Sequence, residues 1–577
     1  MAEHTAVEPI AVLSGVSKSF MAGKRRVTAL HEVSASLRPG CVTVLIGPDG
    51  AGKTTLMRLL AGLLKPDAGE ICVLGMDVLH QPLKVQQQLG YMPQRFGLYE
   101  DLSVQENLDL YADLQLVPHG ERPARYAELM HMTGLAPFGK RLAGQLSGGM
   151  KQKLGLACTL VRSPGLLLLD EPTAGVDPVS RRELWEIVYR QVEGAGMSVL
   201  FSTAYLDEAE RCDDLLLLHQ GQLLGQGKPV EFSRRMQGRT WSVAVGAQSR
   251  RLLQQRLVQQ DGVLDALIQG EEVRLVMHEG RTPETVGWAE GMQFAAVQPR
   301  FEDAFVSMLG GVGAIPAETA PVRQTKAQAG GAVIEVADLS RNFGDFQAVK
   351  GIGFHVERGE VFGLLGANGA GKSTTFRMLC GLLPASSGRL TVAGVNLRQA
   401  PASARGRIGY MSQRFSLYGT LSVLENLRFF SSAYGLSGKG RNERIDWAFE
   451  RFDLRAMADT ASDDLSLGYK QRLAMAAALL HEPDILFLDE PTSGVDPLAR
   501  REFWQRINML AELGVTVLVT THFMEEAEYC DRLVIMAEGS ILAAGTPQAI
   551  KQTAAATGRP VHSMEDAFIA LIQRETA

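Results

Sequence analysis

The sequence predicts an α/β protein in which one type of domain occurs twice in tandem, with a small α+β segment between the two copies. Two glycine-rich loops, GPDGAGKTT and GANGAGKST, occupy equivalent places in the copies, and Lys372 follows Lys53 by 319 residues. The run LLLLDEPTAGVDP, which ends at Pro178, returns as ILFLDEPTSGVDP, which ends at Pro497. Because separate motifs repeat in the same order at one spacing, we take a duplicated α/β domain as the frame of the chain.

Composition agrees with several soluble domains. The chain has 577 residues, 46% apolar and 21% charged, which is too long for one core and predicts two to four domains. Its net charge of −6 argues against a broad nucleic-acid surface, which usually needs a basic excess. The six cysteines are scattered without a CxxC pair, so we expect buried thiols in a reducing compartment.

No targeting or membrane-spanning segment is expected. The start, MAEHTAVEPI, has an early acid and no apolar core of the kind found in signal peptides. The densest apolar runs, such as LLLLD and LLLLH, are far shorter than the roughly 18–20 residues that cross a bilayer. If the protein works at a membrane, other chains would supply the spans.

Each glycine-rich loop has the flanks of a phosphate-binding loop. Short apolar runs (VTVLIG, VFGLLG) predict a buried strand before the loop, and TTLMRLLAGLL and TTFRMLCGLL predict a helix after it. This order aims backbone N–H groups and a helix dipole at a phosphate, with Lys53 and Lys372 on the β- and γ-phosphates and Thr54 and Ser373 offering hydroxyls to Mg²⁺. The alternative, a glycine turn without a ligand, is disfavoured by the repetition. The candidate residues are Gly47, Gly50, Gly52, Lys53, Thr54 and Thr55 in the first half, and Gly366, Asn368, Gly369, Gly371, Lys372, Ser373 and Thr374 in the second.

Two acidic pairs follow predicted buried strands. Asp170 and Asp489 end four-residue apolar runs, where an aspartate can hold Mg²⁺ through water. The next residues, Glu171 and Glu490, are placed to polarise an attacking water. Solubilising charge at a strand end is the alternative for a single pair, but both copies continue with Pro-Thr and a Gly-Val-Asp sequence.

Two serine–glycine turns open predicted helices. LSGGMKQ contains Ser147, Gly148 and Gly149, and LSLGYKQ contains Ser466 and Gly468. Small residues at a helix start leave bare N–H groups that can approach a phosphate. Both serines could also be ordinary helix N-caps.

Taken together, these motifs resemble the ATP-binding-cassette (ABC) ATPases. The resemblance rests on the phosphate loops, the glutamines Gln94 in YMPQ and Gln413 in YMSQ, LSGGxxQ and LLLLDEP, and it covers nearly the whole chain. FGLYEDLSVQENL and FSLYGTLSVLENL are similar to the tandem-cassette ATPases of ABC-2-type exporters, including the drug or cation efflux type. Alternatively, each of these two segments is a capped surface helix that packs on its own domain.

The resemblance implies several features that the residues alone do not. Each half would carry a helical subdomain, and ATP would lie between one half's phosphate loop and the other half's serine–glycine turn. Phe20 and Phe343 would stack on the base, and Gln94 and Gln413 would join the Mg²⁺ site. Two ABC-2-type permease subunits in the membrane would be the partners, and the chain would lie peripherally at the cytoplasmic face of the inner membrane.

The two halves differ at functional positions. The family places a histidine after the last core strand, in contact with the γ-phosphate, and the second half has His522 in LVTTHFMEEAE. The first half has Ala204 there, in LFSTAYLDEAE, and the second half has Leu467 where the first has Gly148. In the crossed arrangement both changes fall on the site of Lys53, so we predict slow hydrolysis there and turnover at the other site. Neutral drift is the alternative. Asp49, in place of Asn368, adds a carboxylate of little expected weight.

The domain organisation follows from composition. We expect the first ABC domain at 8–240, a small α+β domain with a closing helix at 241–309, a flexible linker at 310–331 and the second ABC domain at 332–577. The linker is rich in Gly, Pro, Ala and Thr, and the helices RFEDAFVSML and SMEDAFIALI close the two halves. The sequence assigns no catalytic group to 241–299.

Two other functions stay open. A tandem ATPase of a small-molecule importer has the same layout, although the sequences around the two glutamines favour export. A soluble ABC-type translation factor would carry a long basic arm between its halves. Residues 231–330 contain 11 basic and 11 acidic residues, so this segment has no net positive charge with which to bind RNA.

Overall fold

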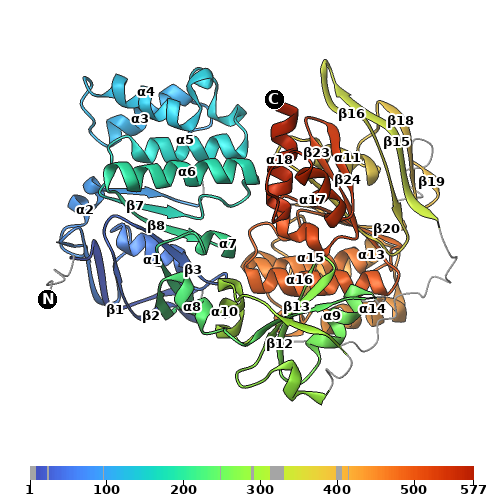
Figure 1. Ribbon diagram of the computed structural model, residues 1–577. Coiled ribbons are helices and arrows are strands. Elements are labelled where there is room, and N and C mark those ends of the chain that lie inside the picture. The colour runs from blue at the N-terminus through green and yellow to red at the C-terminus, as the bar shows by residue number, and fades with distance from the viewer. Residues whose placement is uncertain are drawn as a thin grey trace. The chain divides into compact units, whose positions relative to one another are not determined.

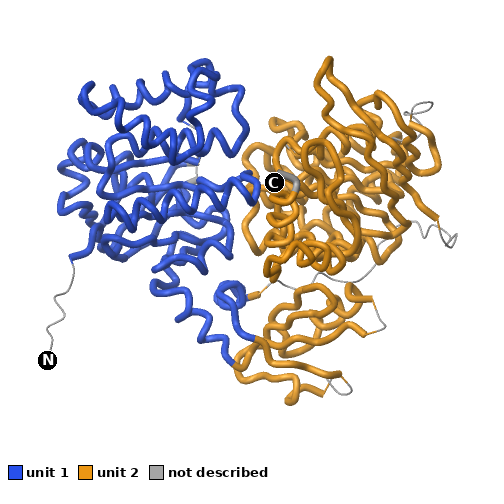
Figure 2. Tube along the Cα trace, turned by 45° about the horizontal axis from the view of Figure 1, so that its top comes forward, with its two compact units in different colours: residues 1–237, 298–310 blue, residues 238–297, 311–577 orange. Residues whose placement is uncertain are grey.

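The computed structural model describes residues 8–22, 25–94, 97–246, 249–287, 292–311, 331–397, 406–413 and 415–576. They form two compact units (Figure 2), one of residues up to 237 with 298–310, the other of 238–297 with residues from 311 onward. We call 8–237 with 298–310 the first lobe, 238–297 the insert and 331–576 the second lobe. The expected linker falls almost wholly on residues 312–330, outside the described residues.

The first lobe is built on a six-stranded sheet of order β10-β9-β3-β8-β7-β6, parallel except for β10. Its central strands are continuous apolar runs that are buried on both faces, as a sheet covered by helices requires. The strands are β3 (Val42–Ile46), β6 (Leu89–Met92), β7 (Leu166–Asp170), β8 (Ser198–Thr203), β9 (Asp214–His219) and β10 (Gln222–Gly227).

A four-stranded antiparallel sheet of order β2-β1-β4-β5 completes the α/β part of the first lobe. Apolar side chains of both sheets and α1 share one core. The strands are β1 (Ala11–Ala22), β2 (Arg25–Leu37), β4 (Ala68–Val73) and β5 (Met76–Asp77), and the helices of this part are α1 (Lys53–Leu60), α2 (Pro82–Gln88), α7 (Leu206–Ala209), α8 (Pro229–Arg234) and α10 (Phe301–Met308).

Helices α3 (Val104–Leu114), α4 (Arg122–Thr133) and α5 (Gly148–Leu160) form the helical subdomain (Figure 1), with α6 (Pro178–Ala195) leading back to the sheet. Helix α3 begins at a capping box in which the Ser103 hydroxyl accepts from the Glu106 N–H and the Glu106 carboxylate accepts from the Ser103 N–H. Fully buried Asn107 donates to the carbonyl oxygens of Tyr99, Leu102 and Ser103, which fixes the preceding loop.

The second lobe repeats this plan, with sheets of order β16-β15-β18-β19 and β20-β21-β22-β17-β23-β24. Its strands are β15 (Ala332–Phe343), β16 (Phe346–Glu357), β17 (Val361–Gly366), β18 (Ser387–Val392), β19 (Val395–Asn396), β20 (Ile408–Met411), β21 (Ile485–Asp489), β22 (Thr516–Thr521), β23 (Arg532–Ala537) and β24 (Ser540–Gly545). Its helices are α11 (Lys372–Leu379), α13 (Val423–Ala433), α14 (Gly438–Arg451), α15 (Leu467–Leu479), α16 (Pro497–Glu512), α17 (Pro547–Ala555) and α18 (Met564–Thr576), and the 3₁₀ segment η7 (Met524–Tyr529) follows β22.

The insert is an antiparallel sheet of order β12-β13-β11-β14 with helix α9 packed on it. Its chain order and strand order are those of a ferredoxin-like split β-α-β unit. A 3₁₀ turn, η3, follows β13, and residues 288–291 lie outside the described residues. The elements are β11 (Thr240–Ala244), α9 (Arg250–Val258), β12 (Val263–Gln269), β13 (Glu272–Met277), η3 (Pro283–Thr285) and β14 (Phe294–Ala296).

Candidate functional site

The first glycine-rich loop joins β3 to α1 and wraps around its own lysine. The Lys53 ammonium donates to the carbonyl oxygens of Gly47 at 2.8 Å and Pro48 at 3.3 Å. A Cβ at Gly47 would lie 2.1 Å from the Leu218 carbonyl oxygen, and Gly52, which caps α1, has a φ of 104°. The loop therefore needs glycine at both places. It leads directly into α1, and the first N–H groups of a helix are the donors that an anion site uses.

The second loop, between β17 and α11, has the same construction. The Lys372 ammonium donates to Gly366 at 2.7 Å and Ala367 at 2.9 Å. Gly371 caps α11 with a φ of 96°, and a Cβ at Gly366 would lie 2.4 Å from the Met536 carbonyl oxygen. Both lysines are buried, so each loop holds a positive charge beside the start of its helix. Such a loop fits a polyphosphate.

The remaining predicted loop residues lie where the motif puts them. Gly50 and Gly369 have φ values of 76° and 84°, the left-handed region that glycine occupies freely. The predicted hydroxyl residues stand in the first turn of each helix, namely Thr54 and Thr55 in α1 and Ser373 and Thr374 in α11.

Asp170 ends β7 beside the first loop. Its Oδ1 accepts from the hydroxyls of Ser202 at 2.8 Å and Thr54 at 3.3 Å, and its Oδ2 lies 3.5 Å from the Tyr91 hydroxyl. Thr54 and Asp170, which the sequence assigned separately to Mg²⁺, are thus brought together. Ser202 was not predicted, although the parallel pairing of β7 with β8 sets Ser202 opposite Asp170.

Asp489 has the same place in the second lobe. Its Oδ1 accepts from the Thr520 hydroxyl at 2.6 Å, and the β21–β22 register sets the two residues opposite each other. Burial raises the pKa of Asp489 above its ordinary value, the Thr520 hydrogen bond opposes the rise, and the charge of Glu490 adds to it.

The predicted catalytic glutamates follow directly, each with a positive φ (50° for Glu171, 46° for Glu490). This backbone turn separates each glutamate from the strand that carries its aspartate. In the first lobe Gln94 Nε2 donates to Glu171 Oε2 at 2.7 Å, and Lys53 Nζ lies 3.6 Å from Glu171 Oε1. In the second lobe Gln413 Nε2 donates to Glu490 Oε2 at 2.8 Å. Both glutamines therefore reach the glutamates, a contact that the sequence did not predict.

Glu490 has a further partner that has no counterpart at Glu171 among the described residues. His522 Nδ1 lies 3.1 Å from Glu490 Oε2. Burial alone would raise the pKa of Glu490, but the hydrogen bond and charge of His522, with Lys372 and Gln413, bring the pKa below its ordinary value. The carboxylate is therefore held ionised, as a proton acceptor must be.

His522 also presents a second ring nitrogen that a ligand could meet. The side chain is 2% exposed, and its Nε2 has no hydrogen-bond partner among the residues that the structure describes. A buried imidazole nitrogen without a partner is costly unless something else completes it. A phosphate oxygen beside the Lys372 loop would do so. Ala204, at the corresponding place in the first lobe, is a buried methyl group that offers no donor.

Comparison with known proteins agrees with this geometry. The family model described as "ABC transporter" matches residues 30–174 and 349–493. The chain is 52% identical to "Probable multidrug ABC transporter ATP-binding protein YbhF" of Escherichia coli (strain K12) over 569 residues, which are 98% of each chain. The chain belongs to the ABC transporter family.

Other relatives match single cassettes. "Linearmycin resistance ATP-binding protein LnrL" of Bacillus subtilis (strain 168) is 40% identical over 215 residues, 37% of this chain and 69% of that protein. A solved structure titled "Structure of ATP binding subunit of ABC transporter" is 32% identical, with a TM-score of 0.39, and covers 42% of this chain and 99% of that one.

Family membership confirms several predictions. The chain is an ATP-binding, ATP-hydrolysing subunit with two tandem ABC cassettes, and it is a component of a membrane-associated transporter that works with a membrane permease. Within the described residues, no helix is both long and apolar enough to cross a bilayer.

The serine–glycine turns of the two cassettes differ in detail. Ser147 caps α5 and accepts from the Met150 N–H at 3.3 Å, whereas the Ser466 side chain makes no capping bond to α15. A Cβ at Gly149 would lie 2.5 Å from the Ser180 hydroxyl, so packing on α6 alone requires glycine there. At Gly468 a Cβ would meet only ordinary contact, and for Gly148 the ligand-binding role stays a prediction.

Phe20 and Phe343 lie late in β1 and β15 with 41% and 47% of their surface exposed. Each has a cation nearby, Lys18 Nζ at 5.7 Å and Arg341 Cζ at 4.6 Å from the ring centroids. Partly exposed aromatic rings at matching positions agree with base stacking, which stays a prediction.

Proposed function

We propose that this chain is the ATPase of an ABC-2-type exporter, which energises efflux of drug- or cation-like compounds through two separate permease subunits at the cytoplasmic face of the inner membrane. The observation that carries the proposal is the 52% identity to YbhF over 98% of both chains, because it includes the insert as well as both cassettes. LnrL is named for linearmycin resistance, and a further relative, at 42% identity, for Nod factor export.

Purification from membranes tests the proposal. The chain should co-purify in mild detergent with two polytopic proteins, and its ATPase activity should rise when they are added. In vesicles that contain all three, ATP should drive substrate in the direction of export. Movement in the opposite direction would favour the importer. Salt-dependent sedimentation with ribosomes, without a polytopic partner, would favour the translation factor.

We also propose that Mg²⁺ binds with ATP at both cassettes. Mg²⁺ prefers octahedral oxygen ligands and usually takes one or two carboxylates, with phosphate and water oxygens completing the set. The Thr54–Asp170 contact already gathers two such donors, and the Gln94 amide nitrogen is engaged by Glu171, which leaves its oxygen for a metal. The proposed ligands are Thr54, Gln94 and Asp170 in the first cassette, and Ser373, Gln413 and Asp489 in the second.

Finally, we propose that the two cassettes turn over at different rates. The second cassette has Glu490 held by His522, whereas the first has Glu171 and a methyl group at Ala204. Loss of one positioned donor to developing charge costs about 10²–10³ in rate, so Ala204 alone could slow its site strongly. In the crossed arrangement that the resemblance implies, Leu467 would face the ATP of Lys53. An isobutyl group at a helix N-terminus crowds the approach of a phosphate oxygen, so Leu467 and the missing imidazole both contribute to the proposed difference.

Matched glutamate variants test this asymmetry. Glu490→Gln should abolish nearly all steady-state ATP hydrolysis, whereas Glu171→Gln should spare much of it. Both changes remove one negative charge from equivalent positions, so each serves as the control for the other. Equal losses would refute the asymmetry and leave the export proposal untouched.

A further inference from the structure

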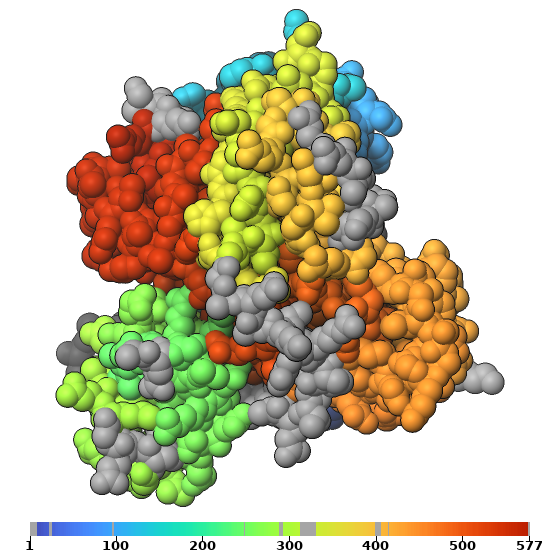
Figure 3. Space-filling view, turned by 90° about the vertical axis from the view of Figure 1, so that its right-hand side faces the viewer, coloured from blue at the N-terminus to red at the C-terminus, as the bar shows by residue number. Residues whose placement is uncertain are grey.

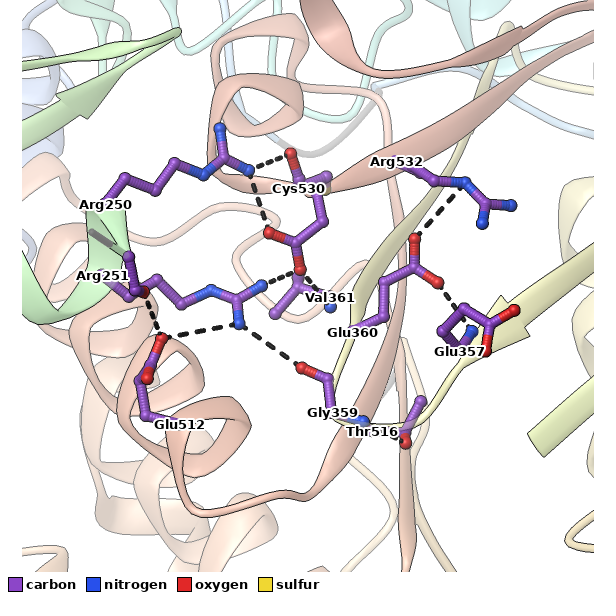
Figure 4. A network of polar contacts seen from close by, with 12 residues as sticks. Arg250, Arg251, Glu357, Gly359, Glu360, Val361, Glu512, Thr516, Cys530 and Arg532 are labelled. Carbon is purple, nitrogen blue, oxygen red and sulfur yellow. Dashed lines mark hydrogen bonds and ion pairs between the residues drawn. The ribbon is translucent and has the colours of Figure 1, made fainter. Parts of the chain in front are cut away.

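The insert binds the second lobe through charged and amide groups rather than through an apolar face alone (Figures 3 and 4). In Figure 3 its green surface lies directly below the red C-terminal part of the second lobe. Arg250 and Arg251, at the start of α9, point into that lobe (Figure 4). Arg250 Nη2 lies 3.2 Å from Asp531 Oδ1, and Arg251 forms an ion pair with the other oxygen of Asp531. Arg250 also donates to the backbone carbonyl of Glu528, at the end of η7.

A second set of contacts holds helix α16. Asp265 of β12 forms an ion pair with Arg501 of α16, and their side chains are 3% and 6% exposed. Asn508, fully buried on the same helix, donates to Gln254 Oε1 at 3.0 Å. A buried ion pair and a buried hydrogen bond between side-chain amides fix the orientation of the insert on the second lobe more strictly than apolar contact does. A buried polar group that lost its partner would cost free energy.

The first lobe has no counterpart to these contacts among its described residues. Arg182 lies five residues after Asp177, as Arg501 lies five after Asp496, yet Arg182 is exposed. The place of Asn508 is taken by Tyr189, whose hydroxyl donates to the Arg211 carbonyl of its own lobe. The second lobe is therefore adapted to the insert by residue type as well as by contact.

The elements that the insert holds lie next to the hydrolytic residues in the chain. Helix α16 begins one residue after Asp496, which caps it, and η7 begins two residues after His522. Arg500, next to Arg501, lies with its Cζ 4.0 Å from the Phe523 ring centroid. That ring stacks on the His522 imidazole at 4.5 Å.

We propose that the insert is a positioning module for the second ATP site, which holds α16 and η7 so that His522 stays against Glu490. Asp265, Arg250 and Arg251 of the insert are positioning residues, because their described contacts are with α16, η7 and Asp531 and not with Glu490 or His522. The inference needs only that the second cassette hydrolyses ATP, and it does not depend on the export or asymmetry proposals. A displacement of about 1 Å of a catalytic group can lower the rate by up to about a hundredfold. Loss of the contacts between the insert and α16 or η7 should therefore give a measurable fall in the rate of ATP hydrolysis.

Asp265→Asn in a Glu171→Gln background tests the proposal, since second-site turnover is then what is measured. We expect kcat to fall about tenfold and KM for ATP to change little. Asp261→Ala, at an exposed position of the insert, is the matched control and should leave both kcat and KM unchanged.

Exchange of the pair, Asp265→Arg with Arg501→Asp, should recover part of the lost kcat if orientation is what matters. If the Asp265 variants do not fold, Arg250→Ala repeats the test at the other contact. Loss of thermal stability with an unchanged kcat would overturn the proposal and leave the insert a packing domain. An equal fall of residual turnover in a Glu490→Gln background would also overturn it, because the effect would not be specific to the second site.

Discussion

Replacement of His522 by alanine tests how the second site holds its glutamate. His522 Nδ1 is 3.1 Å from Glu490 Oε2 within a buried environment, and its Nε2 has no hydrogen-bond partner in the described part of the chain. A hydrogen bond to a charged group contributes about 1.5–3 kcal/mol. If that interaction serves the transition state, its loss lowers kcat by a factor of about 10 to 150. Loss of the Nε2 donor as well places the expected fall at the upper end of this range, near the about 10²–10³ seen for such donors.

The pH dependence gives a second, independent result. The net pKa of Glu490 lies below its ordinary value because His522 and other partners outweigh burial. Without His522 the effect of burial remains, so the pKa of Glu490 rises. Activity needs the carboxylate and is lost as pH falls through that pKa, so the acidic limb of the kcat profile moves to higher pH. His522→Gln, which can keep a donor but loses the charge, should lie between wild type and alanine.

The measurement is steady-state ATP hydrolysis from pH 5 to 9 in a Glu171→Gln background, so that the first site contributes little. His562→Ala, an exposed histidine of the same lobe, is the control and should behave as the parent. A kcat within twofold of the parent together with an unmoved acidic limb would refute the assignment of His522 as the partner of Glu490.

Two further predictions follow from the same geometry. Ala204→His in a Glu490→Gln background should raise first-site hydrolysis only slightly, because Leu467 is still present, and a large gain in the ATPase assay would show that Leu467 is harmless. Asn107→Ala and Asn426→Ala should each lower the free energy of unfolding, measured by chemical denaturation, by about 1–3 kcal/mol. Each buried amide donates to backbone carbonyl groups of the loop before its helix, and these groups would lose their partner. A change under about 0.5 kcal/mol in either variant would contradict this account.

The phosphate loops and acidic pairs were predictable because their structure is local. A strand, a glycine loop and a helix start follow one another within about a dozen residues, and the φ values at Gly52 and Gly371 confirm the demand for glycine. Ser202 and Thr520 could not be assigned in this way, because they reach their aspartates only through the parallel register of two distant strands.

The contacts between the insert and the second lobe could not be predicted from the sequence at all, for a further reason. Arg501 and Arg182 stand at equal distances after the same motif, in helices of similar pattern, yet one is buried and the other exposed. Nothing within either helix separates these two arginines, since the difference lies in Asp265, 236 residues away in the chain. Burial of a charge depends on a distant partner, which periodicity does not reveal.

Two differences between the lobes, one chemical and one of packing, point to the same cassette. The second lobe keeps the histidine against its glutamate, and the second lobe also receives the insert on the helix and the 3₁₀ segment that flank this pair. Drift after duplication would distribute such changes between the lobes without regard to one another. Selection for one reliable hydrolytic site would instead keep His522 and the Asp265–Arg501 ion pair in the same lobe. The first lobe, which keeps Lys53, Asp170 and Glu171 but lacks both features, is then expected to bind ATP as firmly and to release the products of hydrolysis less often.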